Sequence, residues 1–167
     1  MTNLVDTVSS INRRVVITGC GVVCSLGQSS SEVWEAIASN HSGVKLISSF
    51  DVSRYKTKIA AELSDIGSLG KKFRQEYWDT IDKNSQFAVS AGLSAFEDAS
   101  LNFTPQNSSE VAIVLASQWQ EQNVISQPAE ALAGLLGVTG KVLQINALSA
   151  GGIVAISEAA EMIRRGD

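Results

Sequence analysis

The chain has 167 residues, of which 44% are hydrophobic and 18% are charged, and its formal net charge is −4. This composition is typical of one globular domain that is long enough to bury a core. The 13 Lys and Arg residues are scattered rather than clustered, which argues against a nucleic-acid surface. No apolar stretch is as long as a transmembrane helix, and residues 1–12 lack the apolar core of a signal peptide. We therefore predict a soluble, cytoplasmic protein with a mobile tail over residues 1–12 and one domain over residues 13–167.

The predicted elements begin with a strand and a helix. Residues 14–23 form a β-rich apolar run that is interrupted by glycines, which predicts a buried strand that turns tightly at its end. Ser29 and Glu32 stand three residues apart, the spacing of a capping box, at the start of an apolar periodic segment. A helix is therefore predicted over residues 29–40.

Strands and helices alternate through the rest of the chain. Residues 58–63 resemble a short strand, and residues 84–99 carry apolar side chains at helical spacing. Residues 111–116 are a continuous apolar run, of the kind that is buried on both faces of a sheet. A helix is predicted over residues 129–136, because a proline precedes it and a glycine follows it, and the next strand over residues 141–146. This order predicts an α/β fold with a mainly parallel mixed sheet flanked by helices.

A turn of small residues around Ser149 joins the strand over residues 141–146 to a final helix over residues 153–163. Such an elbow directs one side chain and several backbone N–H groups toward the helix start, which suits covalent acyl chemistry. A serine needs a neighbouring base to become nucleophilic at neutral pH, and the only histidine, His41, lies in a predicted loop. Two interpretations follow. Ser149 is either an acylated nucleophile or a small residue at a tight turn that caps the helix.

The final helix is apolar around most of its circumference, because its polar residues form only one stripe. A helix of this kind is normally buried on most sides. Either the chain exposes a large apolar patch or another polypeptide covers that surface. We favour the partner, since patches of that size are uncommon on monomers.

The two cysteines, Cys20 and Cys24, lie in one apolar segment. No further Cys or His pair is available to complete a zinc site, and a disulfide between two residues so close in a strand is sterically poor. We predict that both thiols are reduced and buried, and that the chain binds no metal. Gly19 and Gly21 lack the third glycine and the acidic residue of a dinucleotide-binding loop, so no cofactor is expected.

Several short motifs resemble the β-ketoacyl synthases of fatty-acid and polyketide assembly. They follow one another in the order found in that family: residues 13–23 with Leu26-Gly27, Phe50-Asp51, residues 57–62, Ser85-Gln86-Phe87-Ala88, residues 95–99, and residues 163–167 after the elbow. The resemblance covers nearly the whole chain but only the N-terminal half of that family's proteins. It implies the N-terminal half of a thiolase-like fold, in which two similar α/β halves pack about a five-layered core. The C-terminal half, which supplies two catalytic histidines and a lysine in the family, has no counterpart here.

The chain departs from the family pattern at the elbow. Ser149 falls where the family has its nucleophilic cysteine, so the resemblance implies that the thiolate is lost and that no catalytic residue is expected. The stretch between Val114 and the elbow is shorter than usual, and residues 118–123 replace the family's Gly-rich loop. Part of the surroundings of the acyl substrate is therefore expected to be missing.

Type II polyketide synthases pair an active ketosynthase with a chain-length factor, a homologue that lacks the nucleophile. The resemblance implies a reduced version of that subunit, which pairs with a full-length ketosynthase as a heterodimer and reaches the acyl carrier protein through the complex. The family dimerises through the strand before the elbow, so the implied interface residues are Lys141, Val142, Leu143, Gln144, Ile145 and Asn146. Two alternatives stay open. In the first, the chain is a serine acyltransferase or ketosynthase subunit whose base comes from another chain. In the second, it is the N-terminal piece of a split β-ketoacyl-ACP synthase.

Overall fold

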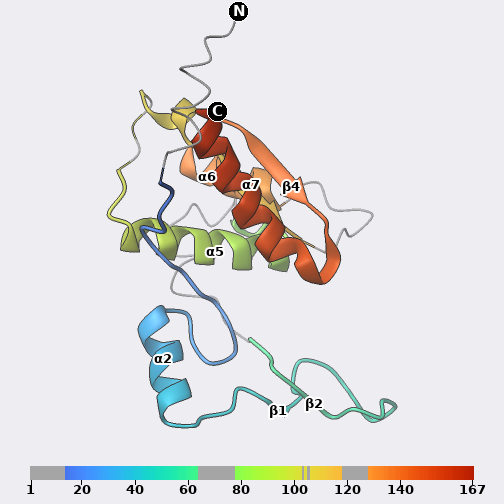
Figure 1. Ribbon diagram of the computed structural model, residues 1–167. Coiled ribbons are helices and arrows are strands. Elements are labelled where there is room, and N and C mark those ends of the chain that lie inside the picture. Colours follow the sequence, from blue (N-terminus) through green and yellow to red (C-terminus); the bar gives the residue numbers. More distant parts are fainter. Residues whose placement is uncertain (1–13, 64–77, 103, 105, 118–127) are drawn as a thin grey trace, which may run out of the picture. The chain divides into compact units, whose positions relative to one another are not determined.

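The computed structural model describes residues 14–63, 78–102, 104, 106–117 and 128–167 (Figure 1). These residues belong to two compact units, one over residues 19–101 and the other over residues 1–18 and 102–167. The predicted tail over residues 1–12 and the replaced loop over residues 118–123 lie outside the described residues. Each unit is described by itself below.

The helix α2 (Ser30–Ala38) in the unit 19–101 begins at the predicted capping box. The hydroxyl of Ser29 accepts a hydrogen bond from the backbone N–H of Glu32 at 3.2 Å, and the Glu32 carboxylate accepts one from the N–H of Gln28 at 2.7 Å. These bonds satisfy N–H groups that have no partner inside a helix. The predicted helix over residues 29–40 is thus confirmed, although none of its residues is buried.

Two short strands follow α2 and form an antiparallel hairpin. β1 (Lys45–Leu46) pairs with β2 (Ile59–Ala60), and the backbone N–H of Ile47 extends the ladder by donating to the carbonyl of Lys58 at 2.9 Å. The predicted strand over residues 58–63 is therefore present, but it is only two residues long. Its pairing fixes both ends of the intervening loop.

The carboxylate of Glu62 binds the start of the loop between β1 and β2 through hydrogen bonds. It accepts hydrogen bonds from the backbone N–H and the hydroxyl of Ser48 at 2.9 and 3.2 Å, and from the N–H and the hydroxyl of Ser49. The Ser49 hydroxyl, followed by the Ser48 N–H, lowers the pKa of Glu62 from its ordinary 4.5 to about 2. Hydrogen bonds donated to a carboxylate favour its charged form, so the loop and the charge stabilise each other.

We expect the order of this loop to depend on pH in one direction. The pKa of Glu62 is lower in the folded chain than in the unfolded one, so its contribution is complete above pH 4.5 and is lost as the pH falls toward and through about 2. Glu62→Gln should remove this dependence and increase amide hydrogen exchange at Ser48 and Ser49 at neutral pH. Exchange rates measured by NMR from pH 7 to 2 test this expectation. Equal protection in the variant and the natural chain would contradict it.

Helix α5 (Lys83–Asp98) of the same unit confirms the predicted helix over residues 84–99. The side chain of Asp82 caps it by accepting hydrogen bonds from the N–H groups of Asn84 at 2.8 Å and Ser85 at 3.1 Å. Ser85, Val89 and Ser90 are its buried residues. Their spacing places them on one face of the helix.

Residues 14–23 do not form the predicted buried strand. Most of the segment is partly or fully exposed, and its backbone has no strand partner among the described residues. Its glycines approach α5 instead, because a Cβ at Gly21 would overlap the backbone carbonyl of Ala91. The N–H of Cys20 donates to the side chain of Asp98 at 2.9 Å rather than to another strand. The predicted burial of the thiols is also wrong, since Cys20 is exposed and Cys24 is only partly buried.

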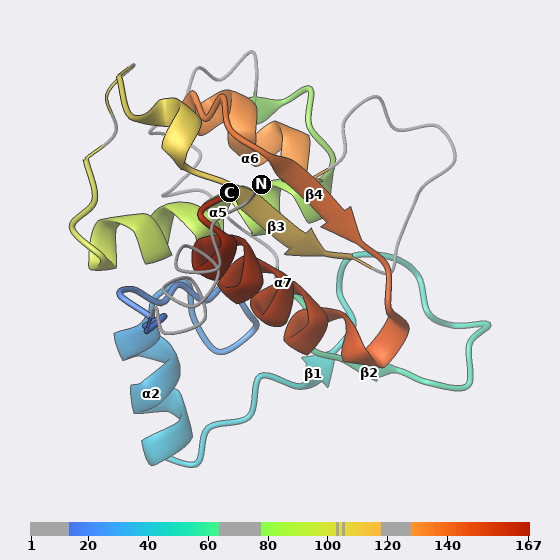
Figure 2. The same ribbon diagram turned by 45° about the horizontal axis from the view of Figure 1, so that its top comes forward.

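The unit that contains residues 102–167 is built on two parallel strands, β3 (Ile113–Ala116) and β4 (Val142–Ile145). Helix α6 (Pro128–Leu136) connects them, and α7 (Gly151–Arg165) follows β4. Figures 1 and 2 show α7 on one side of this sheet and α6 on the other. The predicted strands over residues 111–116 and 141–146 and the predicted helix over residues 129–136 are confirmed.

Two single turns of 3-10 helix complete this unit, η1 (Ser108–Glu110) before β3 and η2 (Leu148–Ala150) before α7. The hydroxyls of Ser108 and Thr139 lie 2.9 Å apart and join the starts of the two strands. The final helix is longer than predicted and begins at Gly151, directly after η2. In the part of the chain that the structure describes, no helix combines the length and the apolar character that a membrane span requires.

Candidate functional site

The contact between α7 and β3 shows which side chains of β4 lie on which face of the β3–β4 sheet. A Cβ at Gly151 would lie only 3.1 Å from the Cβ of Ala116, so the start of α7 packs closely on that side of the sheet. Ala116 pairs in register with Ile145, and residues paired in register share a face. Side chains alternate along a strand, so Leu143 and Ile145 share the α7 side, whereas Val142 and Gln144 share the α6 side.

The backbone of β4 has one paired edge and one open edge. The carbonyls of Lys141 and Ile145 accept hydrogen bonds from Ile113 and Ser117, at 2.8 and 3.0 Å. In a parallel strand the N–H and C=O groups of alternate residues point to opposite edges. The backbone groups of Val142 and Gln144 therefore point away from β3, toward an edge that has no strand partner among the described residues.

The elbow after β4 contains a residue in a rare backbone conformation. Leu148 has φ 49° and its side chain is 72% exposed. For a residue with a Cβ this left-handed region costs about 1–2 kcal/mol, and such strain concentrates at functional sites. Ser149 follows it directly and is exposed. The turn therefore presents the Ser149 side chain at the surface, at the N-terminal end of α7.

Ser149 does not cap α7. The N-cap position is Ala150, and it makes no side-chain capping hydrogen bond. The interpretation of Ser149 as a capping residue is therefore wrong, because η2 shifts the helix start by one residue beyond it. The helix therefore begins without the capping side chain that commonly accepts from its first N–H groups.

The described residues of its own unit offer Ser149 no histidine, because the only histidine of the chain belongs to the other unit. The backbone N–H of His41 donates to the carbonyl of Ala36 at 2.8 Å and ends α2. Within the described residues, no group of three or more His, Cys, Asp or Glu side chains is arranged to hold a metal ion. Within the described residues of its own unit, the elbow thus has the backbone geometry for acyl chemistry without a histidine to accept the serine proton.

The comparison with known families decides the identity of the chain. Residues 12–167 match the family described as beta-ketoacyl synthase, N-terminal domain. The chain belongs to the β-ketoacyl synthase family. It is 38% identical over 116 residues to a protein of Coxiella burnetii named 3-oxoacyl-(acyl-carrier-protein) synthase 2, an alignment that covers 66% of this chain and 28% of that one. It is 34% identical to the actinorhodin polyketide beta-ketoacyl synthase 1 of Streptomyces coelicolor, over 70% of this chain and 25% of that one.

A solved structure supports the same fold. The ketosynthase from module 6 of the bacillaene synthase of Bacillus subtilis is similar with a TM-score of 0.69 and 18% identity. The similarity covers 86% of this chain and 28% of that structure. The predicted fold is thus confirmed as α/β, the N-terminal half of a thiolase-like ketosynthase. The chain spans about a quarter of the length of these ketosynthase relatives.

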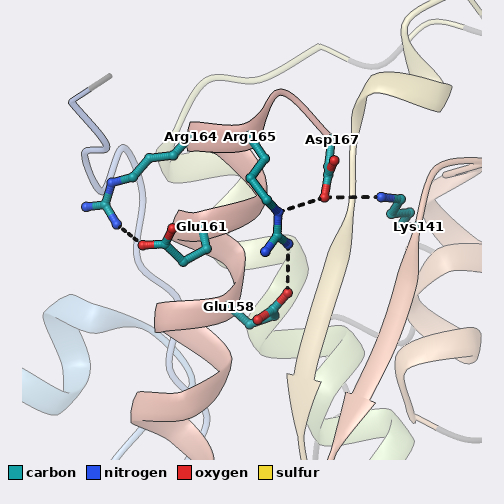
Figure 3. A network of polar contacts seen from close by, with 6 residues as sticks. All are labelled: Lys141, Glu158, Glu161, Arg164, Arg165 and Asp167. Atoms are coloured by element: carbon teal, nitrogen blue, oxygen red, sulfur yellow. Dashed lines mark hydrogen bonds and ion pairs between the residues drawn. The ribbon is translucent and has the colours of Figure 1, made fainter. Parts of the chain in front are cut away.

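The first predicted interface residue has an intramolecular partner in this ketosynthase domain. The ammonium group of Lys141 lies 3.3 Å from the carboxylate of Asp167, which also accepts a hydrogen bond from Arg165 at 3.1 Å (Figure 3). Arg165 reaches Glu158 on the same helix at 3.0 Å. Lys141 and Arg165 hold the pKa of Asp167 below its ordinary value. This exposed network joins the start of β4 to the end of α7, and sequence patterns gave no signal for it.

The other predicted interface residues lie in and after β4. Val142, Leu143, Gln144 and Ile145 form the strand itself, while Asn146 follows it. The side-chain oxygen of Asn146 lies 3.5 Å from the backbone N–H of Leu148, at the outer limit of a hydrogen bond. The predicted interface segment over residues 141–146 therefore leads directly into the elbow. Its open backbone edge begins at Val142, the first residue of β4.

An apolar outer stripe runs along the side of α7 that does not pack on the sheet. It consists of Ile153, Ile156 and Ile163, which are between 52% and 68% exposed. The buried residues of α7 are Gly151, Ala155 and Met162, and they lie on the opposite side of the helix by helical spacing. Both sequence-based alternatives, an exposed patch and a covering partner, require apolar side chains on the outside of this helix, and the described residues have them. A stripe of this kind usually marks an interaction site.

Proposed function

We propose that this ketosynthase domain is a non-catalytic, chain-length-factor-like subunit that pairs with a full-length ketosynthase and stabilises it. In this role it supports elongation of carrier-bound acyl chains in type II polyketide or fatty-acid-like biosynthesis in the cytoplasm. The observation that carries the proposal is Ser149. It stands at an elbow that retains its exposed, strained geometry, at the position where the family resemblance implies a cysteine. Without a thiolate, and without a histidine in the described part of its own unit, this elbow is poorly equipped for acyl transfer.

The open edge of β4 supports the choice of partner. Backbone N–H and C=O groups along an unpaired strand edge are ready to pair with a strand of another chain. The edge formed by Val142 and Gln144 lies in the segment through which the family resemblance implies dimerisation. The outer stripe of α7 adds an apolar surface to the same unit. Together they provide both hydrogen bonds and apolar area for a specific interface. The acyl carrier protein would be engaged through the partner.

Native mass spectrometry after co-expression with the ketosynthase encoded nearby tests the proposal. We expect a one-to-one complex, and we expect this chain to self-associate into folded oligomers when it is expressed alone. A partner that carries only the C-terminal histidine half would instead identify a split ketosynthase. A soluble monomer that takes up an acyl group on Ser149 would overturn the proposal.

A serine acyltransferase is the second candidate, because Leu148 places an exposed Ser149 at an uncapped helix N-terminus. Backbone N–H groups at such a position stabilise a developing oxyanion, which serves either a serine or a cysteine nucleophile. Ser149→Ala separates the two candidates. We expect unchanged product formation by the complex, because a non-catalytic subunit needs no hydroxyl there. Loss of elongation by a complex that still assembles would favour the acyltransferase.

A further inference from the structure

The hairpin of β1 and β2, with its loop, exposes large apolar side chains. Within residues 44–60 these are Val44, Leu46, Phe50, Tyr55 and Ile59, which are between 51% and 71% exposed. Leu46 pairs in register with Ile59, and side chains of paired residues share a face of the ladder. One face of the hairpin is therefore apolar and exposed. An apolar surface of this kind marks a contact with a protein or a membrane.

The loop that carries the two aromatic rings is held together by its own hydrogen bonds. The ammonium group of Lys58 donates to the backbone carbonyls of Val52 and Ser53, the latter at 2.9 Å. The rings of Phe50 and Tyr55 contact each other edge to face, with their centroids 5.7 Å apart. In Figures 1 and 2 the loop extends away from α2, which belongs to the same unit. The rings are therefore presented at the surface in a defined arrangement.

The hairpin is also basic, in contrast to the chain as a whole. Residues 44–62 contain four Lys and Arg against two Asp and Glu, whereas the whole chain contains 13 against 17. The carboxylates of Asp51 and Glu62 accept hydrogen bonds from serines of the loop. Arg54 and Lys56 flank Tyr55 and are exposed, and neither forms an ion pair with another described residue. An anionic surface complements this combination of cations and apolar side chains.

We propose that this hairpin docks on the surface of an anionic lipid bilayer. The rings of Phe50 and Tyr55 enter the boundary between headgroups and acyl chains, where aromatic side chains are favoured. Arg54 and Lys56 stay at the level of the headgroups and pair with the lipid phosphates. The docking is peripheral and reversible. It concerns the unit 19–101 rather than the edge of β4, so it goes beyond the proposed function and does not depend on it.

A bilayer fits this surface better than an acidic protein does. The core of a protein interface needs a partner of complementary shape. A projecting loop that carries apolar side chains enters lipid without such a match, because the bilayer adapts to whatever enters it. Each Lys or Arg near an anionic bilayer also adds to the attraction without a fixed geometry. The exposed rings and the unpaired cations beside them meet both of these conditions.

Vesicle flotation of the full chain tests the proposal, because bound protein rises with the vesicles whereas unbound or aggregated protein stays below. Vesicles of equal parts phosphatidylglycerol and phosphatidylcholine should carry the chain upward, and vesicles of phosphatidylcholine alone should not. Replacing Arg54 and Lys56 together by serine should lower binding roughly tenfold or more, since both cations act near the anionic surface. Leu46→Ser should lower binding severalfold, because it removes exposed apolar area from the hairpin.

The matched control is Ile37→Ser, because Ile37 is 56% exposed on α2 of the same unit but lies outside the hairpin. It should float like the natural chain. Equal flotation of all the variants would overturn the proposal, since another surface would then bind the lipid. Equal binding to neutral vesicles would overturn it as well. A natural chain that does not float, but binds immobilised polyglutamate through Arg54 and Lys56, would identify an acidic protein as the occupant instead.

Discussion

Replacing Val142 by proline is expected to abolish pairing with a ketosynthase while the chain itself stays folded. The backbone N–H of Val142 points to the open edge of β4, so proline removes a donor that only a partner strand uses. The N–H of Leu143 points to β3 by the same alternation, so Leu143→Pro removes a ladder bond inside the chain. The second change should cost about 3 kcal/mol or more of stability, by analogy with proline placed where a backbone donor is needed.

The contrast between these neighbouring variants makes the test specific. Circular dichroism and thermal unfolding report whether each variant is folded, and native mass spectrometry reports the fraction in complex. The expected pattern is a folded, unpaired chain for Val142→Pro and a destabilised chain for Leu143→Pro. A Val142→Pro variant that still pairs fully would show that the partner binds elsewhere.

The outer stripe of α7 is expected to make the isolated chain associate with itself. Exposed isoleucines at Ile153, Ile156 and Ile163 form a contiguous apolar strip along one side of the helix. Replacing Ile153 and Ile156 together by lysine should convert an aggregated or oligomeric chain into a monomer and raise its soluble yield severalfold. Size-exclusion chromatography with light scattering measures the change directly.

The two lysines also change the formal net charge from −4 to −2, so the stripe variant needs a control with the same change in charge. Glu161→Lys changes the charge by the same amount as the two isoleucine replacements, because it removes a negative group and adds a positive one. Glu161 pairs with Arg164 on the polar side of α7. If Glu161→Lys solubilised the chain equally well, charge rather than the apolar stripe would be the cause.

Local signals predicted much of this fold. The capping box at Ser29 and Glu32 located α2, and the continuous apolar run over residues 111–116 located β3. The elbow was predicted because small residues follow an apolar strand directly. Each of these features depends on residues that are close in the sequence, so a pattern of a few residues is enough to predict it.

The failures have a common physical cause, which is dependence on distant partners. Residues 14–23 have strand-like side chains, but a strand forms only when another strand supplies hydrogen bonds, and Cys20 bonds to Asp98 instead. Pattern analysis also missed the tie between Lys141 and Asp167, because it depends on how α7 ends relative to β4. The capping role of Ser149 was wrong for a subtler reason. One turn of 3-10 helix moved the cap to Ala150, a shift that composition does not encode.

The contact of residues 19–21 with α5 imposes an order of events during synthesis. The bond between Cys20 and Asp98 spans 78 positions, so the N-terminal segment emerges from the ribosome long before its partner exists. At about 5–20 residues per second, the delay is roughly 4–16 s. The hairpin of β1 and β2 and the capped helix α2 can form in that interval, because their contacts are local. The contacts of residues 19–21 with α5 must therefore form after these local elements.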